Sequence, residues 1–162
     1  MGQLADRLDA ISVRVRVPGT EIMAELRHRT DVTISFGESV YEFLDERGLE
    51  RFLVSLARML YAAWLREYRA AIADSALDVE PHDQRDHDFF DARSKIEASG
   101  SSAGGRIAFS AKGMQDMSAK IAPGTLRELT ETQFTARAKE AVTALIQDHL
   151  AKVRELKTRF YG

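Results

Sequence analysis

The strongest constraint on the fold is a register that the sequence keeps with itself. When the chain is displaced by 85 positions without a gap, the alternating stretches, chain breakers and amphipathic stretches of the first half fall on those of the second. Identical aligned pairs include Ile11/Ile96, Gly19/Gly104, Ile22/Ile107, Asp31/Asp116, Leu44/Leu129, Glu46/Glu131, Leu60/Leu145, Leu65/Leu150 and Arg69/Arg154. A fixed period without insertions is typical of a repeated structural unit. The shared register, more than the identities, predicts a tandem duplication.

A β-hairpin is the clearest local unit of the second copy. Residues 106–111 and 114–122 carry apolar side chains at alternate positions, which is the period of half-buried antiparallel strands. Gly113 marks the turn between them, because glycine adopts positive φ without a steric penalty. Pro123 ends the second strand, and Thr125 is a candidate cap for the helix that follows.

Each copy is predicted to contain a short helix, a meander of three antiparallel strands and a long helix. The most regular strand pattern is Val13, Val15 and Val17 alternating with two arginines. The predicted elements of the first copy are residues 3–10, 12–17, 21–26, 31–36, a first turn at 40–44 and a helix at 49–72; those of the second are 86–95, 96–98, 106–111, 114–122 and 131–159.

The predicted fold class is therefore α+β, with two tandem helix–three-stranded antiparallel meander–long helix halves forming a pseudo-dimer. Residues 1–73 are the first half, 74–85 an acidic connector and 86–162 the second half. A glycine- and serine-rich segment at 99–105 is expected to be a flexible, exposed loop.

The helix predicted at 49–72 is apolar over more than one face. Leu56 and Leu60 belong to one stripe, and Tyr68 extends the apolar character to a second side. A helix of this kind requires two partners, and we expect its own sheet and the matching helix at 131–159.

Composition narrows the class of protein. A chain of 162 residues with 44% hydrophobic content can form one globular domain or two small halves that share a core. The absence of cysteine excludes disulfides and thiolate metal sites. No apolar run approaches the ~20 residues of a membrane span, and no signal-peptide pattern is present at the N-terminus, so we expect a cytoplasmic protein without membrane partners.

The net charge of -2 conceals an asymmetry. Residues 1–73 hold ten arginines and eleven acidic residues, a net of -1. Residues 74–91 hold one arginine and seven acidic residues, a net of -6, whereas residues 92–162 hold twelve basic and seven acidic residues, a net of +5. The basic part is either an anion-binding face or ordinary solvated surface.

Residues 86–160 resemble the YbaB/EbfC family of bacterial nucleoid-associated proteins. The resemblance lies in the order and spacing of a leading helix, a short strand, a Gly/Ser loop ending in Ala103-Gly104-Gly105, two strands joined at Lys112-Gly113, Pro123, and a long alanine-rich helix. The first half shares it only through the internal repeat. Proteins of this family are homodimers whose long helices project like tweezers, and they bind DNA with little sequence preference.

The resemblance implies that this chain joins both halves of such a dimer covalently, as an internal pseudo-dimer that is itself a monomer or a weak homodimer. The expected partner is duplex DNA, at the nucleoid. Basic residues near the ends of the two long helices are the candidate phosphate ligands: Arg66, Arg69, Lys152, Arg154, Lys157 and Arg159. Basic residues there also complement the helix dipole, which is the alternative explanation. Phe160 and Tyr161 are the only candidates for stacking on single strands.

A protein-interaction or secretion-accessory, chaperone-like module is the second hypothesis, because the same fold family includes such proteins. Its support in the sequence is the wide apolar surface around Trp64 and Tyr68. We expect no enzyme, since the sequence contains no P-loop, GxSxG, HExxH or dinucleotide fingerprint. No cofactor or metal site is expected either: His82 and His87 match no standard metal-ligand spacing, and His149 is expected to be a hydrogen-bonded interface residue.

Overall fold

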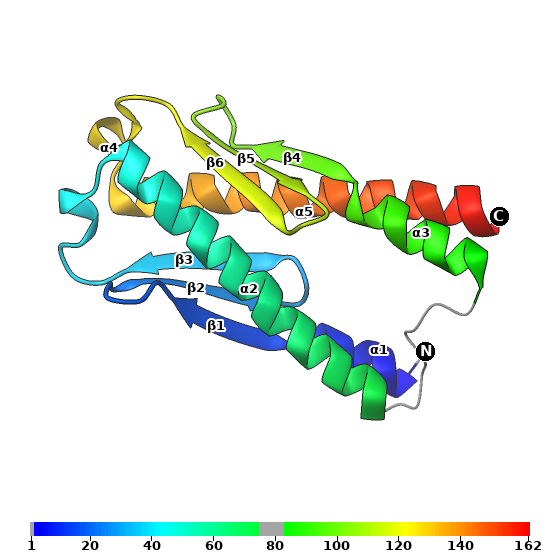
Figure 1. Ribbon diagram of the computed structural model, residues 1–162. Coiled ribbons are helices and arrows are strands. Elements are labelled where there is room, and N and C mark those ends of the chain that lie inside the picture. Colours follow the sequence, from blue (N-terminus) through cyan, green and yellow to red (C-terminus); the bar gives the residue numbers. More distant parts are fainter. Residues whose placement is uncertain (1, 75–82) are drawn as a thin grey trace.

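The computed structural model describes residues 2–74 and 83–162 (Figure 1). The helices and strands of the first half are α1 (Gly2–Asp9), β1 (Ser12–Arg16), β2 (Ile22–Arg27), β3 (Asp31–Phe36), the 3-10 turn η1 (Tyr41–Phe43) and α2 (Glu46–Asp74). Those of the second half are α3 (Gln84–Ser94), β4 (Glu97–Ser101), β5 (Ile107–Lys112), β6 (Asp116–Ile121), α4 (Thr125–Glu128) and α5 (Glu131–Tyr161). Residues 75–82, most of the predicted connector, lie outside the described residues.

The strands form two separate three-stranded antiparallel sheets, ordered β1-β2-β3 and β4-β5-β6. Each of β4, β5 and β6 begins and ends 85 residues after its counterpart in the first sheet, and α5 begins 85 residues after α2. The cross-strand registers follow the same shift, so that Val15 pairs with Ala24 where Gly100 pairs with Phe109. The prediction of an α+β fold with two antiparallel meanders is confirmed.

The two long helices pack reciprocally on the two sheets. Helix α2 lies on β1 and β2 of its own sheet and on β6 of the other, whereas α5 lies on β4 and β5 of its own sheet and on β3 of the other (Figure 1). Contacts between α2 and α5 are few. The expectation that the matching helix would be the second partner of α2 is therefore wrong, because a strand of the opposite sheet covers that face.

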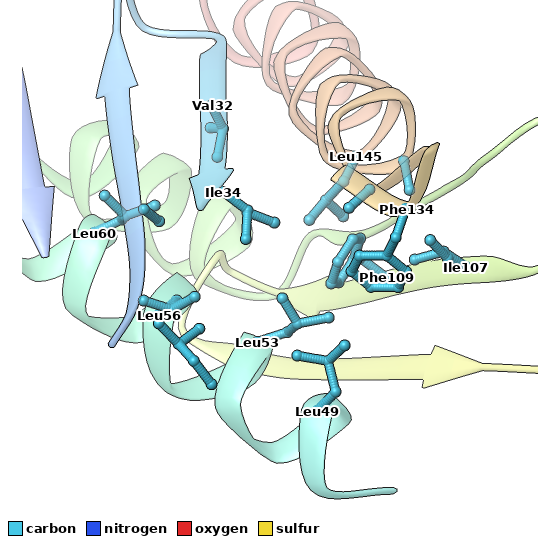
Figure 2. Close-up of a cluster of buried hydrophobic side chains, with 14 of the residues drawn as sticks. Val32, Ile34, Leu49, Leu53, Leu56, Leu60, Ile107, Phe109, Phe134 and Leu145 are labelled. Carbon is cyan, nitrogen blue, oxygen red and sulfur yellow. The ribbon is translucent and has the colours of Figure 1, made fainter. Parts of the chain in front are cut away.

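A single hydrophobic core draws on both halves, as Figure 2 shows. Its side chains alternate along the strands and recur every three or four positions along the helices, which places them on one face of each element. Leu60 and Leu145, at matching positions, are both buried. Phe134 of α5 is fully buried against the rings of Phe36 and Tyr41 from the first half. Burial of one such side chain contributes roughly 1.5–3 kcal/mol.

Hydrogen bonds join the halves near the first turns of α2. The Glu46 carboxylate accepts from the Leu126 amide at 3.0 Å, and the Glu50 carboxylate accepts from the Ile121 amide at 2.7 Å. The Tyr41 hydroxyl donates to the Leu129 carbonyl at 2.9 Å. These three side chains of the first half thereby satisfy backbone groups where β6 ends and the second half turns into α4.

A smaller cluster holds α3 against the end of α5. Phe89 and Ile96 are buried together with Leu156, and Phe160 packs against them. Phe90 is partly buried against the same cluster.

Two local predictions are corrected. Ser99–Ser101, assigned to a loop, extend β4, and Ser102 is buried with its hydroxyl accepting from the Ile107 amide at 3.2 Å. Thr125, proposed as a helix cap, is a buried residue of the short helix α4. The cap of α5 is Thr130, whose hydroxyl accepts from the Gln133 amide in a reciprocal capping box.

Candidate nucleic-acid interface

The C-terminal ends of the two long helices lie on the same side of the molecule, each beside one of the short helices (Figure 1). Helix α1 packs against α2, and α3 packs against α5. This arrangement places basic side chains from residues far apart in the sequence on one side of the fold, which is the precondition for a shared anion-binding surface.

On α2, Arg66 and Arg69 are both exposed, one helical turn apart. Neither has an ion-pair partner within residues 2–74 and 83–162. Trp64 and Tyr68 stack on one another with ring centroids 5.0 Å apart, and Trp64 packs against the core. Trp64, one of the two aromatic residues that favoured a foreign partner, is therefore partly used within the fold.

On α5, Arg154, Lys157 and Arg159 are exposed along the last two turns. They too lack an ion-pair partner among the described residues. Their positive charges lie at the negative end of the helix dipole, which stabilises the helix in the absence of any ligand.

Lys152 occupies a different environment from the other five candidates. Its ammonium group donates to the Glu97 carbonyl at 2.7 Å and to the Asp148 carboxylate at 3.1 Å. The same carboxylate accepts from the Ser99 amide at 2.9 Å. The pKa of Asp148 is lowered by the Ser99 hydrogen bond and then by Lys152. Lys152 and Asp148 together hold the outer edge of β4, so Lys152 is not part of the interface considered below.

Phe160 and Tyr161, the stacking candidates, serve to attach α3. Both rings lie edge-on to Phe89, with centroids 6.0 and 5.4 Å away. The Tyr161 hydroxyl donates to the Asp86 carboxylate, and this hydrogen bond raises the pKa of Tyr161 to about 12. The Arg93 guanidinium lies 4.7 Å from the centre of the Phe90 ring.

His149 is half-buried on α5, 85 residues after Trp64. Burial lowers its pKa, and the positive charge of Arg93 lowers it further. The His149 Nδ1 and the Trp64 Nε1 are both buried without a hydrogen-bond partner among the described residues. The expectation that His149 would be hydrogen-bonded is therefore wrong for Nδ1.

Metal-ligating residues do not converge anywhere in the described ranges, where no group of three or more His, Cys, Asp or Glu side chains is positioned to hold an ion. His87 is exposed on α3, and His82 lies outside the described residues.

An apolar groove that sequence reasoning missed lies where β1 and β2 meet η1. Ile22, Val40, Leu44 and Phe52 line it, and Arg16 borders it. Phe43 is 85% exposed at its wall. The only sequence signal is that Phe43 and Phe52 align with Glu128 and Arg137 of the second half, which breaks the repeat at two apolar positions.

Comparisons with protein-family models, curated proteins and solved structures gave no match to this chain. Within the described residues, none of the helices combines the length and the apolar character needed to cross a bilayer.

Proposed function

We propose that the chain binds duplex DNA with little sequence preference, through Arg66 and Arg69 on α2 and Arg154, Lys157 and Arg159 on α5. The observation that carries the proposal is that these five cations are exposed and unpaired within the described residues, near the ends of two helices on one side of the fold (Figure 1). Unpaired guanidinium and ammonium groups neutralise phosphates without reading bases, so binding through them tolerates any sequence.

We also propose that the chain is a covalently joined pseudo-dimer of the YbaB/EbfC kind. The 85-residue shift shared by all strand bounds and the reciprocal packing of α2 and α5 support this proposal. A fused pair presents two helix ends to one duplex without first having to associate. The loss of translational and rotational freedom on forming the pair is thereby avoided.

Weak binding is expected because acidic side chains lie close to the basic ones. Asp86 contacts the last turn of α5 through Tyr161, and Asp88 and Asp91 follow it on α3. On α2, Glu67 lies between the two arginines in the sequence. These carboxylates reduce the local positive potential that attracts DNA.

The test is fluorescence anisotropy with two labelled duplexes of unrelated sequence over a series of salt concentrations. We expect similar affinities for both duplexes and a decrease of log affinity with log salt at a slope of about -0.9 per phosphate contact, up to about -4.5 for five contacts. The triple variant Arg154→Glu, Lys157→Glu, Arg159→Glu should lose binding and keep its circular dichroism spectrum.

A matched control reverses three exposed basic residues elsewhere in the second half: Lys112→Glu, Lys120→Glu and Arg127→Glu. This variant changes the net charge equally but leaves the helix ends intact, so it should retain most of the affinity. Equal losses in both variants would show that net charge alone drives binding. Absence of binding by the unmodified protein at low salt and micromolar concentration would refute the proposal.

A further inference from the structure

The outer edge of β1 presents unpaired backbone groups. The Val17 amide donates to the Ile22 carbonyl at 3.0 Å, which closes the β1–β2 hairpin. In an antiparallel pair, hydrogen-bonded residues alternate with non-hydrogen-bonded ones. Val15 and Val13 therefore bond to β2, and the amides and carbonyls of Arg14 and Arg16 point away from it. Because β1 is the edge strand of its sheet, they point outward, and no described residue supplies a partner for the Arg14 amide.

The corresponding edge of the second sheet is closed. The Ser102 amide donates to the Ile107 carbonyl at 2.9 Å, so β4 has the same alternation as β1. Its outward Ser99 amide is bonded to Asp148 and its outward Glu97 carbonyl to Lys152.

The α2 residues that match this closing pair are Ala63 and Glu67. Alanine has no polar group, and a carboxylate cannot donate to a carbonyl. The edge of β1 is therefore left open where the edge of β4 is closed.

The region beside Phe43 also differs between the halves, because the second half has an ion pair at the matching position. In the second half, the Arg106 guanidinium pairs with the Glu128 carboxylate across the corresponding position. In the first half, the aligned residues are Glu21 and Phe43, which cannot form an ion pair. The Glu21 side chain instead fills the space beside Gly37, where a Cβ would overlap it. Each of the two closures in the second half is thus missing from the first.

The outer edge of β1 and the groove form one surface. Arg16 belongs to the edge strand and also borders the groove, together with the hairpin residues Gly19 and Thr20. An extended segment that paired with β1 and continued past Arg16 would reach the apolar wall made by Phe43 and Phe52. We call this surface, from Ser12 to Arg16 and on to the groove, the open edge.

The charge of the open edge selects the occupant. Arg14 and Arg16 are exposed on the solvent face of β1; Arg14 pairs with Glu25, and Arg16 has no ion-pair partner among the described residues. Opposite charges in cross-strand positions are stabilising and like charges are not. Two-fold pairing of β1 with β1 of a second copy would bring the arginines of both copies onto one face, which disfavours that occupant.

We propose that the open edge binds an extended acidic segment of a partner protein, which adds to β1 as a fourth strand and places an apolar side chain in the groove. The outward amides and carbonyls of β1 supply the main-chain hydrogen bonds, Arg14 and Arg16 select acidic side chains, and Phe43 and Phe52 bury the apolar one. This is recognition by strand addition, in which the backbone gives affinity and alternate side chains give specificity. It uses a different surface from the cations of the helix ends.

The probe is a fluorescein-labelled ten-residue peptide with glutamate at alternate positions, valine between them and phenylalanine near one end. We expect saturable binding to the full chain by anisotropy. A version with lysine in place of glutamate should not bind. N-methylation of alternate amides gives two peptides, one methylated at the odd positions and one at the even positions. One of the two should bind at least tenfold more weakly, because only the amides that face β1 donate to it.

Arg14→Pro is the decisive variant. The Arg14 amide faces outward, so proline removes a donor from the open edge without removing a backbone hydrogen bond to β2. It also removes the Arg14 side chain and its ion pair with Glu25. We expect at least a tenfold loss of peptide affinity with an unchanged circular dichroism spectrum. Ala63→Glu with Glu67→Lys places a closing pair on α2, with a carboxylate one methylene longer than that of Asp148 for the wider gap between β1 and α2, and Glu21→Arg with Phe43→Glu copies the ion pair of the second half. Each pair should also weaken binding, without a proline in the strand.

Several results would overturn the proposal. Absence of peptide binding, equal binding of the lysine peptide, or unchanged affinity in both Arg14→Pro and Ala63→Glu/Glu67→Lys would each do so. A concentration-dependent dimer in sedimentation that Arg14→Pro abolishes would assign the open edge to a second copy. Loss of duplex binding in Arg14→Pro would assign it to nucleic acid.

Discussion

Gly100→Ala tests a close approach of helix α5 to strand β4. A Cβ at Gly100 would lie 2.2 Å from the Leu145 amide nitrogen, 2.5 Å from the Ala141 carbonyl oxygen and 2.8 Å from the Ala144 carbonyl carbon. All three atoms belong to the backbone of α5, so no side-chain rotation relieves the overlap. The strand and the helix would have to separate by about an ångström to restore ordinary van der Waals distances.

The direction of the stability change distinguishes a steric clash at Gly100 from the usual entropic effect of replacing glycine by alanine. Replacing an unconstrained glycine by alanine stabilises a protein by about 0.4–1 kcal/mol, because the unfolded chain loses freedom. Overpacking a closed interface costs about 1–3 kcal/mol. Because the α5 backbone leaves no room for a Cβ at Gly100, the second effect prevails and Gly100→Ala is destabilising. For a chain of this size the melting temperature should fall by about 2–4 °C per kcal/mol.

The assay is urea unfolding followed by circular dichroism, with thermal melting as a second measurement. Val15→Ala, at the matching position of β1, is the control for a methyl-scale change that removes atoms instead of adding them. It should cost about 0.5–1.5 kcal/mol, in the range of a small core truncation. A Gly100→Ala midpoint equal to or above that of the unmodified protein would show that α5 does not approach β4 as described.

Two further predictions concern the core and the junction between the halves. Leu60→Ala and Leu145→Ala should each cost on the order of 2–5 kcal/mol in urea unfolding, because both side chains are buried in the shared core; an unchanged midpoint in either would contradict the shared core. The second prediction is a pH dependence. Burial, and then Glu46 and Glu131, raise the pKa of Tyr41 from 10.0 to about 12, so the unfolded chain loses this proton first. The Tyr41 contribution is complete below pH ~10 and is lost as pH rises toward ~12. The unfolding midpoints of the unmodified protein and Tyr41→Phe should therefore converge over that interval, and a constant difference would contradict the assignment.

Much of the local structure could be predicted from the sequence because both sheets are half-buried and antiparallel. Alternation at Val13, Val15 and Val17 fixed the first strand, and a glycine or proline ended most of the strands. The strand predicted at residues 31–36 has the bounds of β3. Period and chain breakers are local properties, so they are readable without knowledge of the tertiary contacts.

Tertiary choices were harder to read, because a periodic stripe shows which face is buried without showing what buries it. The second apolar side of α2 fits a helix or a strand equally well, and the structure places β6 there. Ser99–Ser101 looked like a loop because glycine and serine have low strand propensity. Their place in β4 depends on the partner strand and on Asp148, 49 residues away from Ser99. The sequence likewise gives no sign that Lys152 is hydrogen-bonded to β4, because its partner there, Glu97, is 55 residues away.

The close approach at Gly100 also explains why one edge is closed and the other open. Gly100 and Ala141 let the backbones of β4 and α5 come together, and this short distance lets Asp148 and Lys152 reach the edge of β4. The matching residues of the first half are Val15 and Leu56, and their side chains need space between β1 and α2.

A side chain on α2 would therefore have further to reach, and Ala63 does not reach at all. Gly100→Ala should therefore weaken the closing pair as well as the core, because moving α5 outward lengthens the Ser99–Asp148 hydrogen bond. Hydrogen exchange would show it as faster exchange of the Ser99 amide than in the unmodified protein. In a homodimer of identical chains, a substitution that closed one edge would close both. Joining the halves in one chain allows small residues to close β4 while β1 stays open.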